Sequence, residues 1–488
     1  MATDTEANTY DLILIGGGSS SENVADRAAR AGLRTVIVES ALVGGECSYW
    51  ACMPSKALIR SGTALSAARR VGGAAEAVAG RVDVAATLRR RDTIVHDWSD
   101  DSQVNWLESA GIQLIRGHGR LSGVRKVTVT ADDGTTRVLT ARHAVVVSTG
   151  SAALLPDIPG LADAHPWTSR EATSARIMPA SLAILGGGVV GVEIATAYAA
   201  LGTTVTIVSR GPLLRTQEPF AGEMVTEALR ADGVTVLAGT TATRVDRSST
   251  GDVELTLDDG STLSASELLV ATGRTPRTTD VGLDAVGLTP GGWLSVDDTM
   301  LVQGDSPALA GGWLYATGDV NNRALLTHQG KYQARAAGDV IAARAAGTPI
   351  DDAPWGAHVA TADHAAVPQV TFSDPEVASV GLTQAAAEQA GYRIRVLDYD
   401  LSWLGGATVL AEGYTGRVRA IVDLDREVFL GVTFVGQDVG ELLHSATIAV
   451  VGEVPIGRLW HAVPSFPTLS EVWLRLLEEY GRPGDADS

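Results

Sequence analysis

The chain has 488 residues, of which 45% are apolar and 19% are charged, so its length predicts about three domains and its composition is typical of a globular enzyme. Its formal net charge of −19 argues against nucleic acid or an anionic membrane surface as a partner, because both require a basic footprint. No apolar run approaches the roughly 20 residues that span a bilayer.

The first predicted element is a strand over residues 11–15, followed by the glycine loop that begins at Gly16. No basic region precedes this strand, so the start of a domain explains it better than a signal peptide, and we expect a cytoplasmic protein. A predicted helix follows the loop, and a second strand ends in Glu39. Glycines let the backbone approach a pyrophosphate at a helix N-terminus, and an acid about 20 residues later binds ribose hydroxyls. We therefore expect a dinucleotide to bind at Gly16, Gly18, Ser21 and Glu39, where Ser21 replaces the third glycine of the pattern.

The next feature is a pair of cysteines, Cys47 and Cys52, in a chain that has no others. A disulfide scaffold would spread its cysteines, and a structural zinc site would need more ligands nearby, so we expect no metal centre. A close pair in a cytosolic protein indicates either redox chemistry or chance. The surrounding sequence decides between these two.

A second dinucleotide loop is predicted within residues 181–210, where Gly186, Gly188 and Gly191 complete the pattern between two apolar strands. Its second strand ends in Ser209-Arg210 with no acid. A carboxylate would repel a 2′-phosphate and arginine would attract it, so the loop favours NADP, with NAD possible and Arg215 as a further ligand. The alternative is that Arg210 is only a solvated residue at a strand end. Two such folds in one chain predict FAD and a nicotinamide nucleotide.

The segment VGGECSYWACMPSKAL resembles the active-site segment of the flavoprotein pyridine nucleotide-disulfide oxidoreductases, the family of dihydrolipoamide dehydrogenase, glutathione reductase and mercuric reductase. The matching positions are Gly44, Gly45, Cys47, Cys52, Pro54, Ser55 and Lys56. The intervening SYWA differs from the small residues usual in the family, so the substrate face is expected to differ. The resemblance implies that Gly45 and Lys56 contact FAD.

Four later motifs extend the resemblance over nearly the whole chain. They lie at residues 148–151, 271–277, 314–320 and 367–383. The resemblance implies that Gly150 and Asp319 bind FAD and that Gly273 binds NAD(P).

The fold that the resemblance implies is α/β, with two Rossmann-like dinucleotide-binding domains and a C-terminal α+β dimerisation domain. Residues 1–155 and 276–355 would form the FAD-binding and central portions. Residues 156–275 would bind NAD(P), and residues 356–488 would form the interface of a homodimer.

The chemistry that the resemblance implies assigns a role to each active-site residue. Cys52 would meet the flavin, and Cys47 would be the exchange thiol that faces the substrate. Lys56 and Glu193 resemble the ion pair near the reactive flavin nitrogen. Glu193 could instead be a solvent-facing helix residue, but it lies in an apolar stretch where an unpaired acid would be costly.

The sequence departs from the family at Phe466. Disulfide-reducing members carry a histidine before Pro-Thr, and this histidine, supplied by the other subunit, is the general acid–base for the thiols. Here Pro467, Thr468 and Glu471 are kept, but the histidine position is phenylalanine. Either the acceptor needs no proton at this point, or another group such as His461 substitutes.

These features predict an enzyme that passes electrons from NAD(P)H through FAD and a Cys47–Cys52 disulfide to a small acceptor, which is a disulfide or another electrophile. Phenylalanine at position 466 also resembles the ketone-cleaving carboxylase branch of the family, although that branch has histidine where this chain keeps Glu471. The alternatives are therefore a non-disulfide acceptor, such as a quinone or an activated ketone, and a flavin-binding redox sensor with little turnover.

Overall fold

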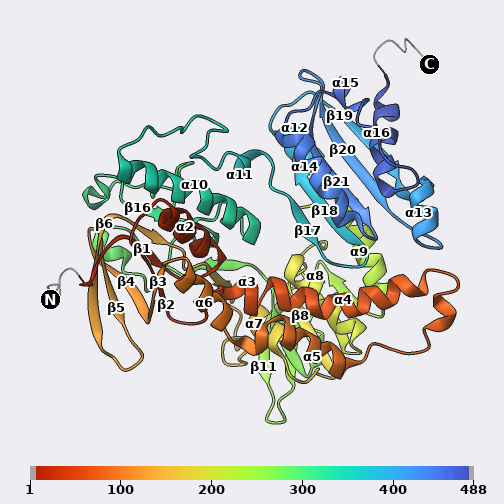
Figure 1. Ribbon diagram of the computed structural model, residues 1–488. Coiled ribbons are helices and arrows are strands. Elements are labelled where there is room, and N and C mark those ends of the chain that lie inside the picture. Colours follow the sequence, from red (N-terminus) through yellow and green to blue (C-terminus); the bar gives the residue numbers. More distant parts are fainter. Residues whose placement is uncertain (1–6, 483–488) are drawn as a thin grey trace. The chain divides into compact units, whose positions relative to one another are not determined.

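The computed structural model describes residues 7–482, which divide into two units (Figure 1). Unit 1 is made of residues up to 54, residues 92–153 and residues 274–364. Unit 2 is made of residues 55–91, residues 154–273 and residues from 365 onward. Unit 2 therefore holds residues expected in the NAD(P) domain and residues expected in the interface domain. The division into three domains stays a prediction.

Unit 1 is built on a seven-stranded sheet in which the order β3-β2-β1-β6-β5-β4 is joined by β16 beside β6. The strands are β1 (Thr9–Ile15), β2 (Thr35–Glu39), β3 (Gln113–Arg116), β4 (His118–Gly123), β5 (Lys126–Thr130), β6 (Thr136–Val147) and β16 (Leu314–Ala316). The strands β3, β2, β1, β6 and β16 run parallel, whereas β5 and β4 continue the sheet antiparallel. Leu12, Ile13 and Leu14 are fully buried, as expected for a parallel strand covered on both faces. A short ladder of β7 (Ser151–Ala153) and β15 (Arg274–Pro276) completes the strands of this unit.

The helix after the first glycine loop, α2 (Ser19–Arg30), packs beside α10 (Thr327–Ala346), and the two lie side by side in Figure 1. Arg27 of α2 forms an ion pair with Asp339 of α10 at 2.5 Å. Gly338 is required at this crossing, because a Cβ there would lie 2.7 Å from the Arg27 side chain. The remaining helices of this unit are α3 (Gly45–Tyr49), α6 (Asp101–Ser109) and α11 (Ala362–Ala365). Helix α4 (Cys52–Arg69) begins in unit 1 and continues into the residues of unit 2.

The middle part of unit 2 has a second parallel sheet, in the order β10-β9-β8-β14. Its strands are β8 (Ser181–Leu185), β9 (Thr204–Ser209), β10 (Thr235–Ala238) and β14 (Glu267–Val270). Its helices are α7 (Ser169–Ser174), α8 (Val189–Ala200) and α9 (Pro219–Ala231). Helix α5 (Val84–Ile94) begins in the residues of unit 2 and ends in those of unit 1. A three-stranded antiparallel sheet is formed by β11 (Ala242–Arg247), β12 (Val253–Leu257) and β13 (Thr262–Ala265). The segment β8-α8-β9 is the second βαβ element that the sequence predicts.

The C-terminal part of unit 2 is an antiparallel sheet in the order β17-β18-β21-β20-β19, coloured blue in Figure 1. Its strands are β17 (Gln369–Thr371), β18 (Glu376–Gly381), β19 (Ile394–Asp400), β20 (Arg417–Asp423) and β21 (Val428–Gly436). Its helices are α12 (Gln384–Gln389), α13 (Gly405–Leu410), α14 (Leu443–Val451), α15 (Ile456–Leu459) and α16 (Val472–Tyr480). All nine residues of the central strand β21 are buried, and Phe434 of this strand meets Trp473 of α16 edge to face. The predicted fold class is confirmed: the chain has two Rossmann-like dinucleotide-binding folds and a C-terminal α+β domain.

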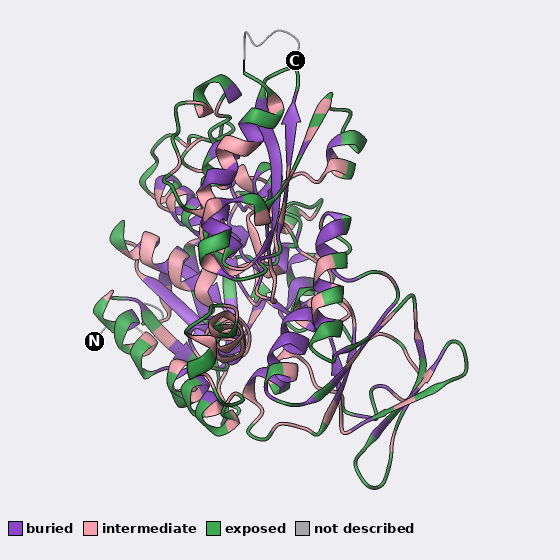
Figure 2. Ribbon diagram, turned by 90° about the vertical axis from the view of Figure 1, so that its right-hand side faces the viewer, coloured by how far each residue is buried: buried purple, intermediate pink, exposed green. Residues whose placement is uncertain are grey.

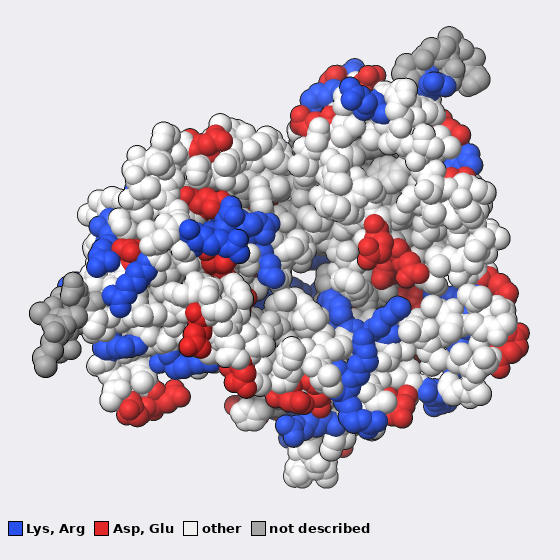
Figure 3. All heavy atoms as spheres, in the orientation of Figure 1, with Lys and Arg blue, Asp and Glu red and all other residues white. Residues whose placement is uncertain are grey.

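Burial follows the sheets, whose central strands are coloured as buried in Figure 2. Charged side chains of both signs lie on the face shown in Figure 3, so the net charge of −19 does not make that face uniformly acidic. Within residues 7–482, every helix is too short or too polar to cross a membrane.

Candidate active site

The first glycine loop joins β1 to α2 and is shaped by close backbone contacts. Gly16 has φ +98°, and a Cβ there would lie 2.5 Å from the Ser148 carbonyl oxygen, so only glycine fits. Gly18 precedes α2, and a Cβ there would meet no atom within 4 Å. The buried Ser21 hydroxyl donates a hydrogen bond to the Gly16 carbonyl oxygen at 2.5 Å, which accommodates serine at the third glycine position. The loop therefore leaves open space at the N-terminus of a helix, as a pyrophosphate requires.

Glu39 lies at the end of β2, against this loop. Its Oε2 atom accepts a hydrogen bond from the Gly17 backbone N–H at 2.5 Å, and its Oε1 atom accepts one from the Ala41 N–H at 2.6 Å. The carboxylate is thus fixed beside the open space, where ribose hydroxyls are expected.

Two other segments of unit 1 meet the first loop. A Cβ on Gly45 would lie 2.9 Å from the Gly18 Cα, so glycine is needed where the cysteine segment crosses the loop. The buried hydroxyl of Thr149 has no hydrogen-bond partner among residues 7–482. A buried hydroxyl without a partner fits a bound ligand that supplies one. This observation and the open glycine loop fit a dinucleotide such as FAD.

Asp319 lies in a small polar cluster with Ser151 and Arg274. The Ser151 hydroxyl donates a hydrogen bond to the Asp319 carboxylate at 2.5 Å, and the Arg274 guanidinium lies 3.6 Å from the same carboxylate. Gly150, the residue before Ser151, has φ +71°. The sequence analysis predicted Gly150 and Asp319 as FAD ligands and did not name Ser151 or Arg274, although these two lie in the motifs at residues 148–151 and 271–277.

The two cysteines lie on consecutive helices of unit 1. Cys47 is in the single-turn helix α3, and Cys52 is the first residue of the 18-residue helix α4. Both are free thiols. A hydrogen bond between their sulfurs, together with burial, raises the pKa of Cys47 well above its usual range. Cys52 lies at the N-terminus of α4, an environment that favours a thiolate.

A further contact to the thiols comes from α10. The Cys52 Sγ atom lies 3.3 Å from the Thr327 hydroxyl oxygen, and Thr327 is the first residue of α10. The charge of Lys331, one turn later on α10, lowers the pKa of Cys47 against the larger effects that raise it. No sequence pattern predicts the contact of Thr327, because 275 positions separate this residue from Cys52.

The expected pair of Lys56 and Glu193 is present in unit 2. The Lys56 Nζ atom lies 2.6 Å from Glu193 Oε2, and Glu193 is only 4% exposed. Its other oxygen accepts a hydrogen bond from the Phe372 backbone N–H at 3.0 Å, and the Lys56 ammonium lies 4.8 Å from the centre of the Phe372 ring. Glu193 is therefore not a solvent-facing helix residue. Its role beside a flavin stays a prediction.

The second glycine loop, between β8 and α8, repeats the geometry of the first. Gly186 has φ +117°, and a Cβ there would lie 2.3 Å from the Ala271 carbonyl oxygen. A Cβ on Gly191 would lie 2.2 Å from the Gly186 carbonyl oxygen, while one on Gly188 would meet no atom within 4 Å. Only glycine fits the first two positions, and the third leaves the helix N-terminus open.

Ser209 lies against the second loop as Glu39 lies against the first. A Cβ on Gly187 would lie 3.1 Å from the Ser209 Cβ, and a Cβ on Gly17 would lie 3.0 Å from the Glu39 Cβ. The second loop thus has a hydroxyl where the first has a carboxylate.

Arg210 and Arg215, near this loop in the sequence, are both exposed and have no hydrogen bond or ion pair within residues 7–482. Their charge is not neutralised by an acid of the described chain. Gly273 has φ +148° and follows β14. These features fit a nucleotide that carries a 2′-phosphate.

Phe466 lies in the loop before α16, and 75% of its surface is exposed. Glu471 is buried, and its Oε1 atom pairs with Arg475 at 2.5 Å. The Oε2 atom of Glu471 is also buried and has no hydrogen-bond partner in the described residues. His461 is exposed, and no hydrogen bond or ion pair joins its side chain to the described part of the chain. Substitution of the missing histidine by His461 stays untested.

Comparison with known proteins places the chain in a family. The family model described as pyridine nucleotide-disulphide oxidoreductase matches residues 10–339, and the model of the dimerisation domain of that family matches residues 367–476. A dihydrolipoyl dehydrogenase of Chlorobaculum tepidum is 34% identical over 477 residues and covers 96% of each chain. A mercuric reductase of Streptomyces lividans is 32% identical and covers 93% of each chain.

Solved structures show the same fold. The HOCl-induced flavoprotein disulfide reductase RclA of Escherichia coli, solved as a Cu(II) complex, has a TM-score of 0.81 at 22% identity, over 96% of this chain and 99% of that one. LpdA of Mycobacterium tuberculosis has a TM-score of 0.79 at 24% identity, over the same shares. With both family models matched in order, this chain belongs to the pyridine nucleotide-disulphide oxidoreductases, FAD-dependent enzymes that use NAD(P)H.

Proposed function

We propose that this protein passes electrons from NADPH through FAD and the Cys47–Cys52 pair to a small acceptor. The observation that carries the proposal is the contact between the only two cysteine sulfurs of the chain, one of them at a helix N-terminus. A pair so placed can alternate between a dithiol and a disulfide, which takes up two electrons and two protons. Bound FAD would accept a hydride from NADPH and deliver the electron pair to the disulfide.

The residues that would hold FAD all lie in unit 1. Gly16 and Gly18 leave room for the pyrophosphate, and Glu39 is fixed where it can accept hydrogen bonds from ribose hydroxyls. Gly45 keeps the cysteine segment close to this loop. The free hydroxyl of Thr149 and the carboxylate of Asp319 supply further polar contacts.

The two thiols have different roles in this proposal. Cys52, with its helix N-terminus and the Thr327 hydroxyl, is the thiol through which electrons enter. With a disulfide acceptor, the Cys47 thiolate attacks one acceptor sulfur, which forms a mixed disulfide and releases the first acceptor thiolate. The Cys52 thiolate then attacks the Cys47 sulfur, which restores the Cys47–Cys52 disulfide and releases the second. Each released thiolate takes up one proton.

The proton supply makes a second candidate acceptor worth testing. Phe466 cannot hold a proton, and a positioned acid–base typically contributes about 10²–10⁴-fold to the rate. We therefore expect slow turnover of disulfides. A quinone or an activated ketone, which takes electrons without the exchange of a leaving thiolate, is the alternative that Phe466 favours.

The preference for NADPH over NADH rests on the second glycine loop. Ser209 replaces the acid that would repel a 2′-phosphate, and the exposed guanidinium groups of Arg210 and Arg215 are free to attract one. NADH remains a possible weaker donor, since the glycine loop itself does not distinguish the two.

The active form in this proposal is a homodimer. The chain carries the dimerisation domain of the family at residues 367–476. Large apolar side chains in the C-terminal part of unit 2 are exposed, among them Trp403, Val409, Ile448, Val463 and Phe466. Exposed apolar side chains in such number are typical of a surface that a partner covers, and a second copy of this domain is the partner that twofold symmetry provides.

Chemical trapping of the thiols tests the proposal without any acceptor. The oxidised protein is mixed with NADPH anaerobically, quenched with iodoacetamide and weighed by mass spectrometry. We expect no label before NADPH and two labels per chain after it, a count that is unambiguous because the chain has only two cysteines. Cys52→Ser should leave Cys47 reactive without any reductant. Reduction of the flavin by NADPH while both thiols stay unlabelled would show that the pair is not in the electron path.

A further inference from the structure

The segment that leads into α6 contains three consecutive residues with a left-handed backbone. His96, Asp97 and Trp98 have φ values of +51°, +50° and +58°, and none of them is glycine. L-residues adopt this conformation at single positions rather than in a row, because the Cβ atom comes too close to the following carbonyl oxygen. Two backbone hydrogen bonds close the turn, from Trp98 to Val95 at 3.0 Å and from Ser99 to His96 at 2.9 Å. These three residues form the left-handed turn.

The first two side chains of the turn do not explain its conformation. His96 and Asp97 are exposed, and neither side chain forms a hydrogen bond or an ion pair within residues 7–482. Strained backbone of this kind persists where surrounding contacts determine it, and it is concentrated at functional sites. Contacts of this kind are formed by Trp98 and the two residues that follow it.

The turn meets the cysteine segment, residues 43–52, at Tyr49. The Trp98 Nε1 atom donates a hydrogen bond to the Tyr49 carbonyl oxygen at 3.1 Å. The Tyr49 hydroxyl donates one to the Ser99 carbonyl oxygen at 3.2 Å. Tyr49 is fully buried, and it is therefore held through both its backbone and its side chain.

Two further contacts hold the first half of the cysteine segment. The buried Asp100 carboxylate accepts a hydrogen bond from the Val43 backbone N–H at 2.7 Å. The Arg277 guanidinium forms an ion pair at 2.9 Å with Glu46, the residue before Cys47. Cys47 therefore lies between points of the chain that are held on either side of it.

These contacts matter because α3, which carries Cys47, is too short to hold its own shape. It has only five residues, whereas an isolated helix shorter than about 12 residues is marginal in water. The last carbonyl groups of a helix have no partner inside it. The Trp98 N–H binds one of these groups, at the point where the chain turns toward Cys52. Loss of this hydrogen bond would loosen the four residues between the two cysteines.

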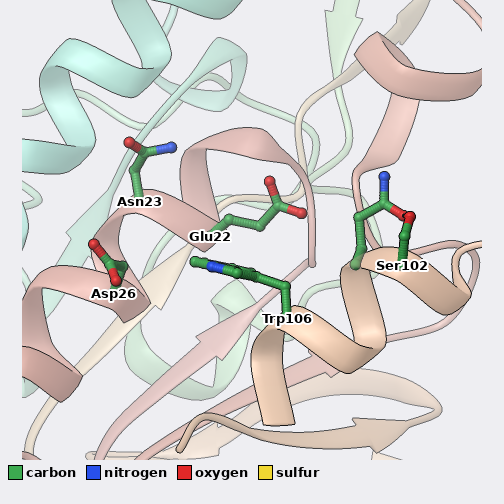
Figure 4. Close-up of a pocket in the computed structure, with 6 residues that line it drawn as sticks. Glu22, Asn23, Asp26, Ser102 and Trp106 are labelled. Atoms are coloured by element: carbon green, nitrogen blue, oxygen red, sulfur yellow. The ribbon is translucent and has the colours of Figure 1, made fainter. Parts of the chain in front are cut away.

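The cavity beside α6 lies outside these contacts. Helix α6 follows the turn and faces α2 across a cavity of about 330 Å³ (Figure 4). The lining residues of the cavity are Glu22, Asn23, Asp26, Ser102, Gln103 and Trp106. None of them belongs to the left-handed turn or to the cysteine segment, so the cavity does not interrupt the contacts between the two.

We propose that the left-handed turn positions the thiol pair, and that Trp98 is the positioning residue that keeps Cys47 within reach of Cys52 for closure of their disulfide. The inference rests on the proposed function in taking this disulfide as the one that forms in turnover. In that step the Cys52 thiolate attacks the Cys47 sulfur of the mixed disulfide, a bond forms between the two sulfurs, and the second acceptor thiolate leaves and takes up a proton. Holding two reacting groups together raises their effective concentration, so the turn favours the disulfide.

The equilibrium of the thiol pair with glutathione measures this effective concentration. The FAD-loaded protein is equilibrated with mixtures of glutathione and glutathione disulfide, and its free thiols are labelled with iodoacetamide and counted by mass spectrometry. We expect Trp98→Phe, which keeps an aromatic ring but lacks the N–H, to lower the effective concentration by about tenfold. For this two-electron couple, such a change raises the reduction potential by about 30 mV. Tyr49→Phe, which removes only the hydrogen bond to the Ser99 carbonyl, should change it in the same direction.

Trp313→Phe is the matched control. Trp313 is fully buried in unit 1, and its Nε1 atom donates the same kind of hydrogen bond, to the Ala308 carbonyl oxygen at 2.7 Å. This variant should unfold at a lower urea concentration and keep the wild-type effective concentration. An equal change in Trp98→Phe and Trp313→Phe would overturn the inference, because general loosening of unit 1 would then account for both. Wild-type values in both Trp98→Phe and Tyr49→Phe would overturn it as well.

Asp97→Gly tests the conformation of the turn separately. Glycine adopts a φ of +50° without a steric cost, so this variant should resist urea better than the wild type and keep its effective concentration. A less stable Asp97→Gly protein would show that residue 97 is not left-handed and would defeat the inference.

The glutathione equilibrium uses no NADPH, so it separates this inference from the proposed function. A protein whose flavin NADPH reduces while both thiols stay oxidised would defeat the proposed function, and the effect of Trp98→Phe on disulfide closure would still be measurable. A protein whose thiols NADPH reduces normally, with an equilibrium that Trp98→Phe leaves unchanged, would defeat the inference alone.

Discussion

Phe466 and Glu471 both lie close to the same glycine, Gly405. A Cβ on Gly405 would lie 3.0 Å from the Phe466 ring and 3.8 Å from the Glu471 Oε2 atom. Arg475 occupies the other oxygen of Glu471, so Oε2 is the atom left to accept a hydrogen bond. The site therefore keeps the acceptor for an imidazole N–H but lacks the imidazole.

Restoring a histidine should restore part of the missing acid–base catalysis. We expect Phe466→His to raise kcat/KM for a disulfide acceptor above the wild-type value and to introduce a pH dependence near ~6.5, the ordinary imidazole pKa. Glu471 Oε2 would hold the new ring, so Glu471→Gln in the same chain should remove much of the gain. Phe466→Asn, which is polar but does not titrate, is the matched control. Fast disulfide turnover by the wild type, unchanged in His461→Gln, would show that no proton relay is needed here.

The preference for NADPH over NADH should reverse when a carboxylate is placed beside the second glycine loop, as Glu39 lies beside the first. Ser209→Glu combined with Arg210→Ala should place a carboxylate beside Gly187, as Glu39 lies beside Gly17, and remove one guanidinium. We expect the kcat/KM ratio of NADPH to NADH to fall by about tenfold or more, and each factor of ten is about 1.4 kcal/mol. Arg176→Ala removes an exposed arginine elsewhere in unit 2 and should leave the ratio unchanged. A wild-type enzyme that NADH reduces faster at equal low concentrations would contradict this prediction.

The pKa shift of Glu22 predicts a pH-dependent gain in stability for Glu22→Gln. Burial raises the folded-state pKa of Glu22 above its unfolded value, so the folded protein holds this proton more tightly. Its contribution to the free energy of unfolding is greatest below the unfolded pKa of ~4.3 and falls as pH rises through the folded pKa. At pH 7 the variant should therefore be more stable than the wild type by up to about 1 kcal/mol, and the difference should shrink in acid. Urea unfolding at several pH values measures this, with Glu108→Gln as the control. A less stable variant at pH 7 would mean that Glu22 has a stabilising partner.

Dimer formation should depend on the exposed apolar side chains of the C-terminal part. Light scattering should give twice the chain mass of 50.6 kDa for the wild type at micromolar concentration. Val463→Glu, at a side chain that is 86% exposed, should shift the protein toward monomer, because a buried unpaired charge opposes association. Ile177→Glu changes a residue that is 82% exposed outside this part and should leave the mass unchanged. A fully active wild-type monomer would exclude the dimeric site.

Two kinds of feature were predictable from the sequence: glycines whose conformation is set locally, and an ion pair that the family resemblance supplies. Gly16 and Gly186 could be predicted because a strand, a tight turn and a helix N-terminus allow only glycine at that point. The Lys56–Glu193 pair followed from the family motif and from the cost of an unpaired acid in an apolar helix.

Other site residues depend on packing between distant segments, which the sequence pattern does not encode. Thr327 reaches Cys52 only because α10 begins beside the start of α4. The cavity at Glu22 depends on how α2 meets α6, and no spacing within either helix predicts it. The pair of Glu471 and Arg475 has the i, i+4 spacing of a helix, so the sequence pattern alone could have predicted it.

The contact between Thr327 and Cys52 also bears on the redox potential of the thiol pair. The first residues of α4 and α10 meet at the Cys52 sulfur, so the positive ends of two long helices face the same atom. Such an environment stabilises the thiolate of the reduced pair relative to the disulfide. A more stable reduced form raises the reduction potential, as in the strongly oxidising dithiol proteins. Under the proposed function, electrons would then arrive at Cys52 readily and leave less readily, and we expect an acceptor that is itself a good oxidant.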